Sequence, residues 1–506
     1  MSGGPAVKPS MDVPYQYESR TMKSFTTAKT LIAVPALVIL DVLAIGFSLL
    51  TAYILRINFL PIILPGLFKP ELLNDTIVNL WWLPLVLIVC MAYEDLYQKR
   101  LPYWKEVEKI LKSSTLAVTL AISFLYMAKL SAEISRTLVI MSWLISILYI
   151  PLLRYLGKKL LVRLGVWSKP VLIVGAGKTG ELVLKALTRE YTMGYQSIGF
   201  LDDNKELINI HESKSGLRIP ILGNFEDAEE LIAKTKVQDV IVAAPGLPPK
   251  ELVTLTNRLQ PLVNNVMVVP DLFGLSMNGI EVEYFFDEQT LLLNIKNKLR
   301  SALNRGIKRA FDIVTGTIIS VLCIPILVIL AVLIKVDSRG PAFFKQERLG
   351  QNGETFICYK FRTMYLAGDK ILKSYLKANK DAREEWQTYN KLKGNDPRVT
   401  RVGCFLRKYS LDELPQLINV ILGDMSLVGP RPYLIREKNQ MGDWIHDILV
   451  AKPGITGLWQ VSGRNLIEFE GRLKLDTWYV RNWSIWLDIV LLLKTIRVVI
   501  KREGAY

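Results

Sequence analysis

Histidine and cysteine, the side chains that most often bind zinc in proteins, are scarce in this chain of 506 residues. The two histidines, His211 and His446, are far apart and lie in no HExxH motif. The four cysteines form no CxxC pair, and two of them lie in or beside apolar segments. They are Cys90, Cys323, Cys358 and Cys404. The sequence therefore argues against a disulfide framework and against a metal centre built on these side chains.

We also expect no cleavable signal sequence, because the first apolar stretch is too long and begins too late. Half of the residues are apolar, which indicates several domains that include membrane segments. The net charge is +16, yet the lysines and arginines lie beside apolar runs and form no single basic tract. We therefore expect anionic lipid and phosphorylated substrates as partners, and no nucleic acid.

Four apolar stretches in the first third of the chain have the length of about 17 to 25 residues that a bilayer core demands. They run from Leu31 to Leu55, Ile77 to Tyr93, Ser114 to Leu130 and Thr137 to Leu153. Basic residues such as Arg20 and Lys23 precede the first stretch, and others follow the second and the fourth. The positive-inside rule therefore predicts an N-terminal tail (1–29), four transmembrane helices (30–165) and a cytoplasmic remainder.

Asp41 lies within the first apolar stretch. A carboxylate at such a position either marks a functional site or pairs with a neighbouring helix. We expect pairing.

The pattern changes after Lys169. An apolar run from Pro170 to Val174 predicts a strand, and an amphipathic stretch from Glu181 to Tyr191 predicts a helix. Three glycines in the spacing GxGxxG join them, namely Gly175, Gly177 and Gly180. This is the opening of a βαβ unit.

A second predicted strand ends at Asp202, about 20 residues past the glycines, where an acid binds ribose in a dinucleotide-binding fold. The sequence therefore predicts a Rossmann-like α/β domain (166–300). Its candidate nucleotide-binding residues are the three glycines and Asp202. No Ser/Tyr/Lys set of a short-chain epimerase follows, so we favour a regulatory or dimerising scaffold over redox chemistry.

A further apolar run, Phe311 to Ile334, is long enough to span a membrane and has basic residues at both ends. Spanning would carry the rest of the chain away from cytoplasmic nucleotides, and the flanking charges favour the inside at both ends. Pro325 removes a backbone donor near the middle of the run. We expect a re-entrant helix, about residues 308–336, that breaks there and returns. A kinked spanning helix is the alternative.

The residue pattern of the C-terminal region predicts a second membrane element. Lys494, Arg497 and Lys501 share one face of a helix whose opposite face is apolar, as in an interfacial helix (about 483–502).

A segment dense in charged residues lies between these two elements. Its motifs are Gln346 to Gly350, Tyr359 to Met364, Asn395 to Arg398, Leu406 to Lys408, Ser410 to Gln416, Gly423 to Pro432, Lys452 to Gly457 and Gly463-Arg464. Transfer of a sugar phosphate between anions needs cations around the phosphoryl oxygens, a divalent metal, and a carboxylate that holds the metal or attacks phosphorus. This segment contains these parts. Ser410 to Glu413 also fits a capping box at the start of a helix from Leu414 to Leu422.

The stretch from Lys308 to Tyr506 resembles the bacterial sugar transferase family, the monotopic polyprenyl-phosphate phosphoglycosyl transferases. The family's Asp-Glu dyad matches Asp412 and Glu413, and further motifs match Lys360 to Met364 and Gly429 to Pro432. With four preceding helices and a Rossmann-like insert, the chain is similar to the longer subgroup of undecaprenyl-phosphate galactose phosphotransferases. One departure is Ile324-Pro325, where the family has Ser-Pro at the helix break.

The resemblance implies a fold of α/β plus membrane helices, with an α-rich monotopic catalytic domain (301–506). It implies transfer of a hexose 1-phosphate from a UDP-sugar to undecaprenyl phosphate with release of UMP, galactose being expected first and glucose second. This reaction initiates O-antigen, capsule or exopolysaccharide assembly at the cytoplasmic face of the bacterial inner membrane.

The resemblance also implies roles for residues. Asp412 would form a phospho-aspartate intermediate and Glu413 would hold Mg²⁺. Four cations would contact phosphate or substrate, namely Lys360, Arg362, Arg407 and Arg431. We further expect a homodimer.

Two other classes remain open. One is a membrane-bound nucleotide-sugar epimerase or dehydrogenase that uses Gly175 to Gly180, and the other is a non-catalytic scaffold for glycan assembly. No residue here is assigned to a sugar hydroxyl, so the residues alone leave the hexose open.

Overall fold

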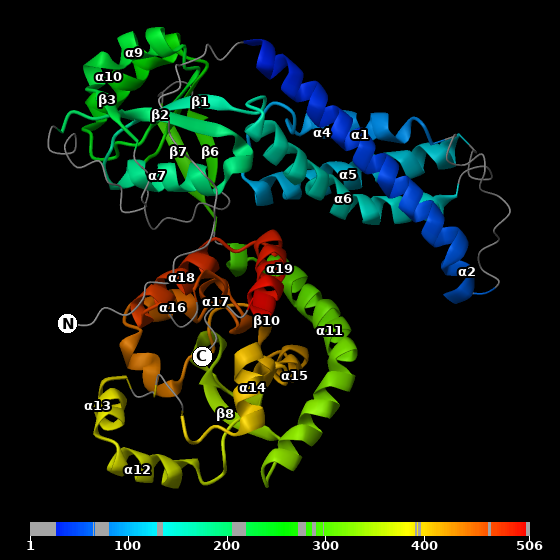
Figure 1. Ribbon diagram of the computed structural model, residues 1–506, viewed down its shortest axis with the longest axis vertical. Helices are drawn as coiled ribbons and strands as arrows, with labels where there is room; N and C mark the ends of the chain where they lie inside the picture. Colours follow the sequence, from blue (N-terminus) through cyan, green and yellow to red (C-terminus); the bar gives the residue numbers. More distant parts are fainter. Residues whose placement is uncertain are drawn as a thin grey trace. The chain divides into compact units, whose positions relative to one another are not determined.

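Figure 1 shows the computed structural model, coloured in chain order from blue to red. It describes residues 27–63, 65, 80–128, 135–204, 219–271, 280–285, 290–296, 298–389, 392, 396–463 and 467–501. Most of the predicted tail (1–29), with Arg20 and Lys23, lies outside these ranges, as do His211, Asn395 and Arg464. The chain divides into two compact units, Met1–Asp271 and Leu272–Tyr506.

The first unit begins with apolar helices. They are α1 (Thr27–Asn58), α2 (Leu60–Ile63), α4 (Leu83–Tyr93), α5 (Tyr103–Met127) and α6 (Arg136–Arg163). Three segments of this unit are long and apolar enough to cross a membrane: α1 together with α2, then α5, and then α6. One helix of the second unit also meets this condition. The second predicted span is described only in part, as the 11 residues of α4.

Helices α5 and α6 extend beyond the predicted spans on the side predicted to be cytoplasmic. α5 begins at Tyr103 instead of near Ser114, and α6 ends at Arg163 instead of near Leu153. Once a helix has formed, each further residue adds a backbone hydrogen bond whatever its side chain. The apolar stretch therefore indicates the membrane core but not the end of the helix.

Five polar side chains meet inside this bundle. Arg154 donates from Nε and Nη2 to the two oxygens of Asp41, at 2.7 and 2.6 Å. It also donates to Oε1 of Glu106 at 2.9 Å, which accepts from Lys158 at 2.7 Å. The hydroxyl of Tyr97 donates to Asp41 at 2.7 Å. All five are buried, and two carboxylates balance two cations. The expectation that Asp41 pairs with a neighbouring helix is confirmed.

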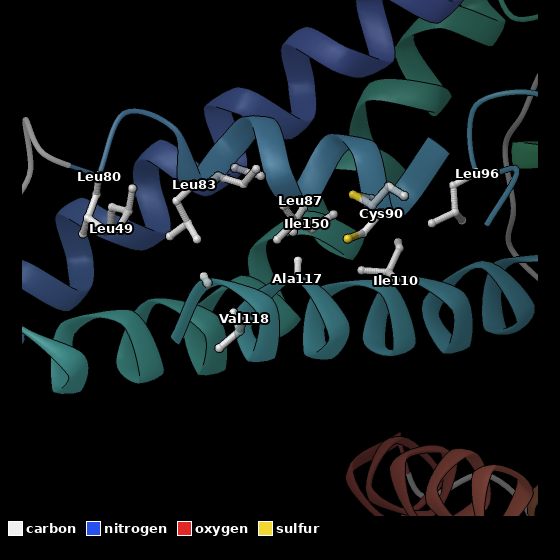
Figure 2. Close-up of a cluster of buried hydrophobic side chains, with 14 of the residues drawn as sticks. Leu49, Leu80, Leu83, Leu87, Cys90, Leu96, Ile110, Ala117, Val118 and Ile150 are labelled. Atoms are coloured by element: carbon white, nitrogen blue, oxygen red, sulfur yellow. The ribbon is translucent and has the colours of Figure 1, made fainter. Parts of the chain in front are cut away.

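Apolar side chains fill the rest of the bundle. Figure 2 shows Leu49 of α1, Leu87 and Cys90 of α4, Ala117 of α5 and Ile150 of α6 in one buried cluster. Cys90 is a free thiol and packs here as a small apolar side chain.

The loop between α4 and α5 joins the bundle to the α/β domain of the same unit. Nη1 of Arg100 donates to the carbonyls of Trp167 and Met193, at 3.2 and 2.7 Å. Its guanidinium lies over the ring of Trp167, 4.4 Å from the centroid. The backbone N–H of Tyr103 donates to Glu190 at 3.1 Å.

The α/β domain is a five-stranded parallel sheet in the order β3-β2-β1-β4-β5. Its strands are β1 (Lys169–Val174), β2 (Tyr195–Leu201), β3 (Ile221–Gly223), β4 (Asp239–Val242) and β5 (Asn265–Val268), and its helices are α7 (Lys178–Arg189), α9 (Ala228–Thr235) and α10 (Pro249–Leu259). This order is the first part of a doubly wound sheet. The central strands β1 and β4 are buried along nearly their whole length, as their apolar runs indicate. The predicted Rossmann-like fold is confirmed.

The second unit is rich in helices. Its strands are β6 (Ile280–Phe285), β7 (Thr290–Ile295), β8 (Phe343–Leu349), β9 (Thr355–Phe361), β10 (Ser426–Val428) and β11 (Gly454–Thr456). Its helices are α11 (Ala302–Asp337), α12 (Gly368–Ala378), α13 (Lys380–Tyr389), α14 (Arg401–Tyr409), α15 (Gln416–Leu422), α16 (Trp444–Ile448), α17 (Leu458–Ser462), α18 (Phe469–Arg481) and α19 (Ile485–Lys501). β6 with β7 and β8 with β9 pair antiparallel, and β10 with β11 pairs parallel.

α11 is one helix of 36 residues that runs through Pro325. The break expected at Ile324 and Pro325 is therefore not formed. A proline inside a helix removes one hydrogen bond and is accommodated when the helix bends. Figure 1 shows α11 as a curved ribbon along one side of the second unit.

Both ends of α11 are fixed to the same unit. Near its start, Lys308 donates to Asp488 of α19 at 2.7 Å, and Asp312 accepts from the backbone N–H of Leu427 in β10 at 3.1 Å. At its end, Asp337 accepts from the backbone N–H of Val402 in α14 at 3.2 Å. Between these anchors many apolar side chains are exposed, among them Val314, Ile318, Val321, Leu322, Ile324, Val328, Ile329 and Val332.

Replacement of Arg154 by alanine should destabilise the first unit, because Asp41 and Glu106 would stay buried without their shared cation. We expect a loss of about 3 to 5 kcal/mol in the free energy of unfolding, measured on the purified full chain in detergent. The matched control is Lys99→Ala, which removes a cation from an exposed pair with Asp95 and should change stability little. Equal effects of the two substitutions would contradict the prediction.

Candidate active site

The adjacent carboxylates Asp412 and Glu413 lie in a short 3-10 helix, η8 (Leu411–Glu413), between α14 and α15. Ser410 ends α14 with a left-handed backbone, at φ 55°. Such a backbone is strained for a serine and persists where the surrounding structure fixes it, often at functional sites. It turns the chain sharply just before the two carboxylates.

The predicted capping box is wrong. Ser410 makes no side-chain capping hydrogen bond, and α15 begins at Gln416, after Pro415. The physical reason is that Ser410 serves as the C-cap of α14, whereas an N-cap serine needs an extended backbone. Asp412 and Glu413 therefore precede α15 and do not lie in its first turn.

Asp412 and Glu413 line a cavity of about 940 Å³, a size within the range of small-ligand sites. All four predicted cations line the same cavity. β9 carries Lys360, α14 carries Arg407, and Arg431 lies in the turn after β10. Residues far apart in the sequence are thus brought around one space.

The two carboxylates are in different electrostatic states. Nζ of Lys360 donates to Oε1 of Glu413 at 2.7 Å. Burial disfavours the charge on Glu413, but the attraction of Lys360 outweighs burial, so the pKa of Glu413 is below its ordinary value. Burial, together with the negative charge of Glu413, raises the pKa of Asp412 to about 6. A carboxylate with a raised pKa is less stabilised as an anion and is therefore the better nucleophile.

Arg407 and Arg431 retain donors for a ligand. Nε of Arg407 donates to Oγ1 of Thr363 at 3.0 Å, and its terminal nitrogens make no hydrogen bond within the described residues. The guanidinium of Arg431 lies over the ring of Trp459, 5.5 Å from the centroid. Its side chain makes neither a hydrogen bond nor an ion pair in the described part of the chain. Both side chains can therefore donate to phosphate oxygens.

Arg362 has a different role in this structure. Its Nη1 donates to the carbonyl of Arg339 at 2.8 Å, and its Nη2 donates to the carbonyl of Ser338 at 2.7 Å. It thus binds the carbonyl groups that follow α11. A cation is favourable there because the C-terminal end of a helix carries a partial negative charge. Arg362 thus lines the cavity and also binds the end of α11, and its contact with substrate stays a prediction.

Among the cavity residues to which the sequence patterns gave no role are Thr363, Arg398 and Trp459. Thr363 and Arg398 belong to recognised motifs but had no role, and Trp459 lies between two motifs. Arg398 is oriented by both oxygens of Asp396, from Nε at 2.9 Å and from Nη2 at 2.6 Å. The short Asp-x-Arg spacing was the one signal for this pair.

The glycine turn of the α/β domain is a separate site. Gly175 has φ +105°, and a Cβ at Gly180 would collide with the carbonyl of Gly175, so both positions require glycine. Oδ2 of Asp202 accepts from the backbone N–H of Ala176 at 2.7 Å. The structure brings Asp202 to the glycine turn as predicted. Its carboxylate already accepts one of the backbone N–H groups of that turn. Nucleotide binding by Gly175, Gly177, Gly180 and Asp202 stays a prediction.

Comparison with known families matches two parts of the chain. Residues 303–502 match the model described as "Bacterial sugar transferase". Residues 93–270 match the model described as "CoA-binding domain", a range that contains α5, α6 and the α/β domain.

Individual relatives extend over most of the chain. The undecaprenyl-phosphate galactose phosphotransferase of Salmonella typhimurium is 37% identical over 81% of this chain and 84% of its own length. The UDP-galactose-lipid carrier transferase of Erwinia amylovora is 35% identical over 95% and 99%. The UDP-glucose:undecaprenyl-phosphate glucose-1-phosphate transferase of Escherichia coli is 30% identical over 68% and 70%. Identity of this extent, with the family's carboxylate pair set among cations in one cavity, shows that the chain belongs to the bacterial sugar transferase family.

Proposed function

We propose that this protein transfers galactose 1-phosphate from UDP-galactose to undecaprenyl phosphate and releases UMP. The observation that carries the proposal is the pair Asp412 and Glu413 in a cavity that also contains Lys360, Arg407 and Arg431. The names of the Salmonella and Erwinia relatives support galactose. The name of the Escherichia relative supports glucose 1-phosphate as the second candidate.

Two displacements at one phosphorus account for the reaction. A carboxylate oxygen of Asp412 attacks the phosphorus that carries the sugar, and the bond to the nucleoside phosphate breaks, so UMP leaves with that electron pair. A phosphate oxygen of undecaprenyl phosphate then attacks the same phosphorus. The bond to Asp412 breaks, which restores the carboxylate and forms undecaprenyl-diphosphate-galactose.

The cations stabilise the charge that builds up on the phosphoryl oxygens. Arg407 and Arg431 have donors that the described residues leave unbound, so these donors serve the phosphates of the donor and the acceptor. Lys360 lies against Glu413 and keeps that carboxylate ionised.

The carboxylates of the cavity suit a Mg²⁺ site in which substrate phosphates supply the remaining ligands. Mg²⁺ is usually held by one or two carboxylates together with phosphate oxygens. Glu413 supplies one such carboxylate, and no cluster of three or more His, Cys, Asp or Glu that could hold a metal ion by itself occurs among the described residues. When bound, Mg²⁺ would neutralise charge on the diphosphate. We propose Glu413 as its ligand.

We propose that α11 enters and leaves the membrane on the cytoplasmic side of the bacterial inner membrane. At about 1.5 Å per residue, its length would suffice to span, and its exposed apolar side chains suit lipid. Both of its ends, however, are hydrogen-bonded to the same compact unit, which would have to lie on both sides if α11 spanned. The exposed Leu493, Ile496 and Ile500 support α19 as an interfacial helix beside it.

Asp412→Asn should lower UMP release by roughly 10³-fold or more, because an amide cannot replace the nucleophile. The assay contains membranes, Mg²⁺, undecaprenyl phosphate and either UDP-galactose or UDP-glucose. Asp447→Asn, which changes an exposed carboxylate of α16, is the control and should keep full activity. UMP release that survives Asp412→Asn would refute the mechanism.

Activity should fall as the pH is lowered through about 6, because the pKa of Asp412 is raised to about 6 and only its ionised form attacks. The group is ionised above this value and protonated below it. A plot of log kcat/KM against pH should bend near 6, with a slope of one on the acid side. A bend near 4, typical of an unperturbed carboxyl group, would contradict the raised pKa.

Single cysteines can test the path of α11, with Cys323 and Cys404 replaced by serine. We expect Leu303→Cys and Val336→Cys, at exposed positions near the two ends, to react with an impermeant maleimide from the cytoplasmic side of inverted vesicles. Met127→Cys, at the end of α5 predicted to face outward, should react from the opposite side. Labelling of Leu303→Cys and Val336→Cys from opposite sides would show a spanning helix.

A further inference from the structure

Arg431 lies in the turn Gly429 to Pro432, which leads out of β10. The backbone N–H of Arg431 donates to Oδ2 of Asp476 in α18 at 3.0 Å. The hydroxyl of Tyr433 donates to the same oxygen at 2.8 Å. Asp476 thereby holds the main chain of Arg431 and the side chain of Tyr433, the two residues that flank Pro432.

Asp476 is an unusual group to bury. It is fully covered, and its second oxygen, Oδ1, has no hydrogen-bond partner among the described residues. Burial raises the pKa of Asp476 to about 7, against the attraction of the Arg431 and Arg472 charges. A buried, incompletely bonded carboxylate costs stability, and such groups are often retained for function.

A ring orients the side chain of Arg431. The guanidinium lies 5.5 Å from the centroid of Trp459, and the guanidinium of Arg472, one turn before Asp476 on α18, lies 5.3 Å from the same centroid. A cation over an aromatic face is attracted without being neutralised. The ring holds Arg431 in place but leaves its N–H groups available.

We propose that Asp476 and Trp459 are positioning residues for Arg431, the first through its main chain and the second through its guanidinium. The inference rests on the proposed function, in which Arg431 binds a phosphate oxygen. A direct ion pair between Asp476 and the guanidinium would compete with phosphate for the same donors. Contact through the backbone and the ring orients the cation and avoids that competition.

A double-mutant cycle tests the proposal. In the otherwise native chain, we expect Asp476→Asn and Trp459→Leu each to lower kcat by roughly 10- to 100-fold, with a smaller change in KM. In an Arg431→Ala chain, the same substitutions should each change kcat by less than about 2-fold, because the residue they position is gone. Trp459→Phe, which keeps an aromatic face, should recover most of the activity lost in Trp459→Leu.

Additive effects in the two backgrounds would overturn the proposal, because they would show that Asp476 and Trp459 act without Arg431. An unchanged kcat in both Asp476→Asn and Trp459→Leu would also overturn it. Melting of each purified full-length variant in detergent identifies misfolded protein. If Asp476→Asn does not fold, the comparison of Trp459→Leu in the native and the Arg431→Ala chains decides whether the proposal holds. If the wild-type protein releases no UMP from either UDP-sugar, the proposed function is refuted. If the wild-type protein is active but the effects in the cycle are additive, only this inference is refuted.

Discussion

The buried ion pair between Lys308 and Asp488 is the contact on which the geometry of the second unit depends. Asp488 accepts from Lys308 at 2.7 Å, from the hydroxyl of Tyr479 at 2.7 Å and from Nε1 of Trp483 at 3.0 Å. Lys308 also donates to the carbonyl of Val428, the last residue of β10, at 3.0 Å. A buried pair is tolerated only when its remaining donors and acceptors are satisfied, and here Tyr479, Trp483 and Val428 satisfy them. The turn that carries Arg431 starts at Gly429, directly after Val428.

Helix α11 is therefore part of the active-site framework. Its first half contacts β10 and α19 through Lys308 and Asp312, and the backbone carbonyls that follow its last turn accept from Arg362, next to β9. Lys360 lies two residues before Arg362 on the same stretch of chain. A displacement at either end of α11 would thus be transmitted to a cation beside Asp412 and Glu413. The cations themselves are held in three ways: Lys360 by the carboxylate of Glu413, Arg407 by the hydroxyl of Thr363, and Arg431 by the ring of Trp459.

Much of this arrangement could be predicted from the sequence, for identifiable reasons. Strands β1 and β4 are short apolar runs, and the glycines after β1 have few structural alternatives, so the α/β fold followed from pattern alone. The carboxylate pair and its cations followed from motif resemblance. Ser410 was misassigned because a serine three residues before a glutamate fits a capping box, whereas the chain used it to end the preceding helix. The bonds of Arg362 to backbone carbonyls could not be predicted, because a motif records which residues occur together, but not which of them binds the backbone.

The interior contacts of α11 have a consequence for dissecting this protein. A shortened chain that starts at residue 272 would keep the cavity, but it would still carry the exposed apolar face of α11 and would require lipid or detergent. Deleting α11 as well would remove Leu330 and Ile334 from the core they share with Phe361 and Leu406. It would also remove Lys308, the cation that is bound to Asp488. The apolar helix α11 and the walls of the cavity thus belong to one compact unit, so removing α11 to gain water solubility would also remove contacts that shape the cavity.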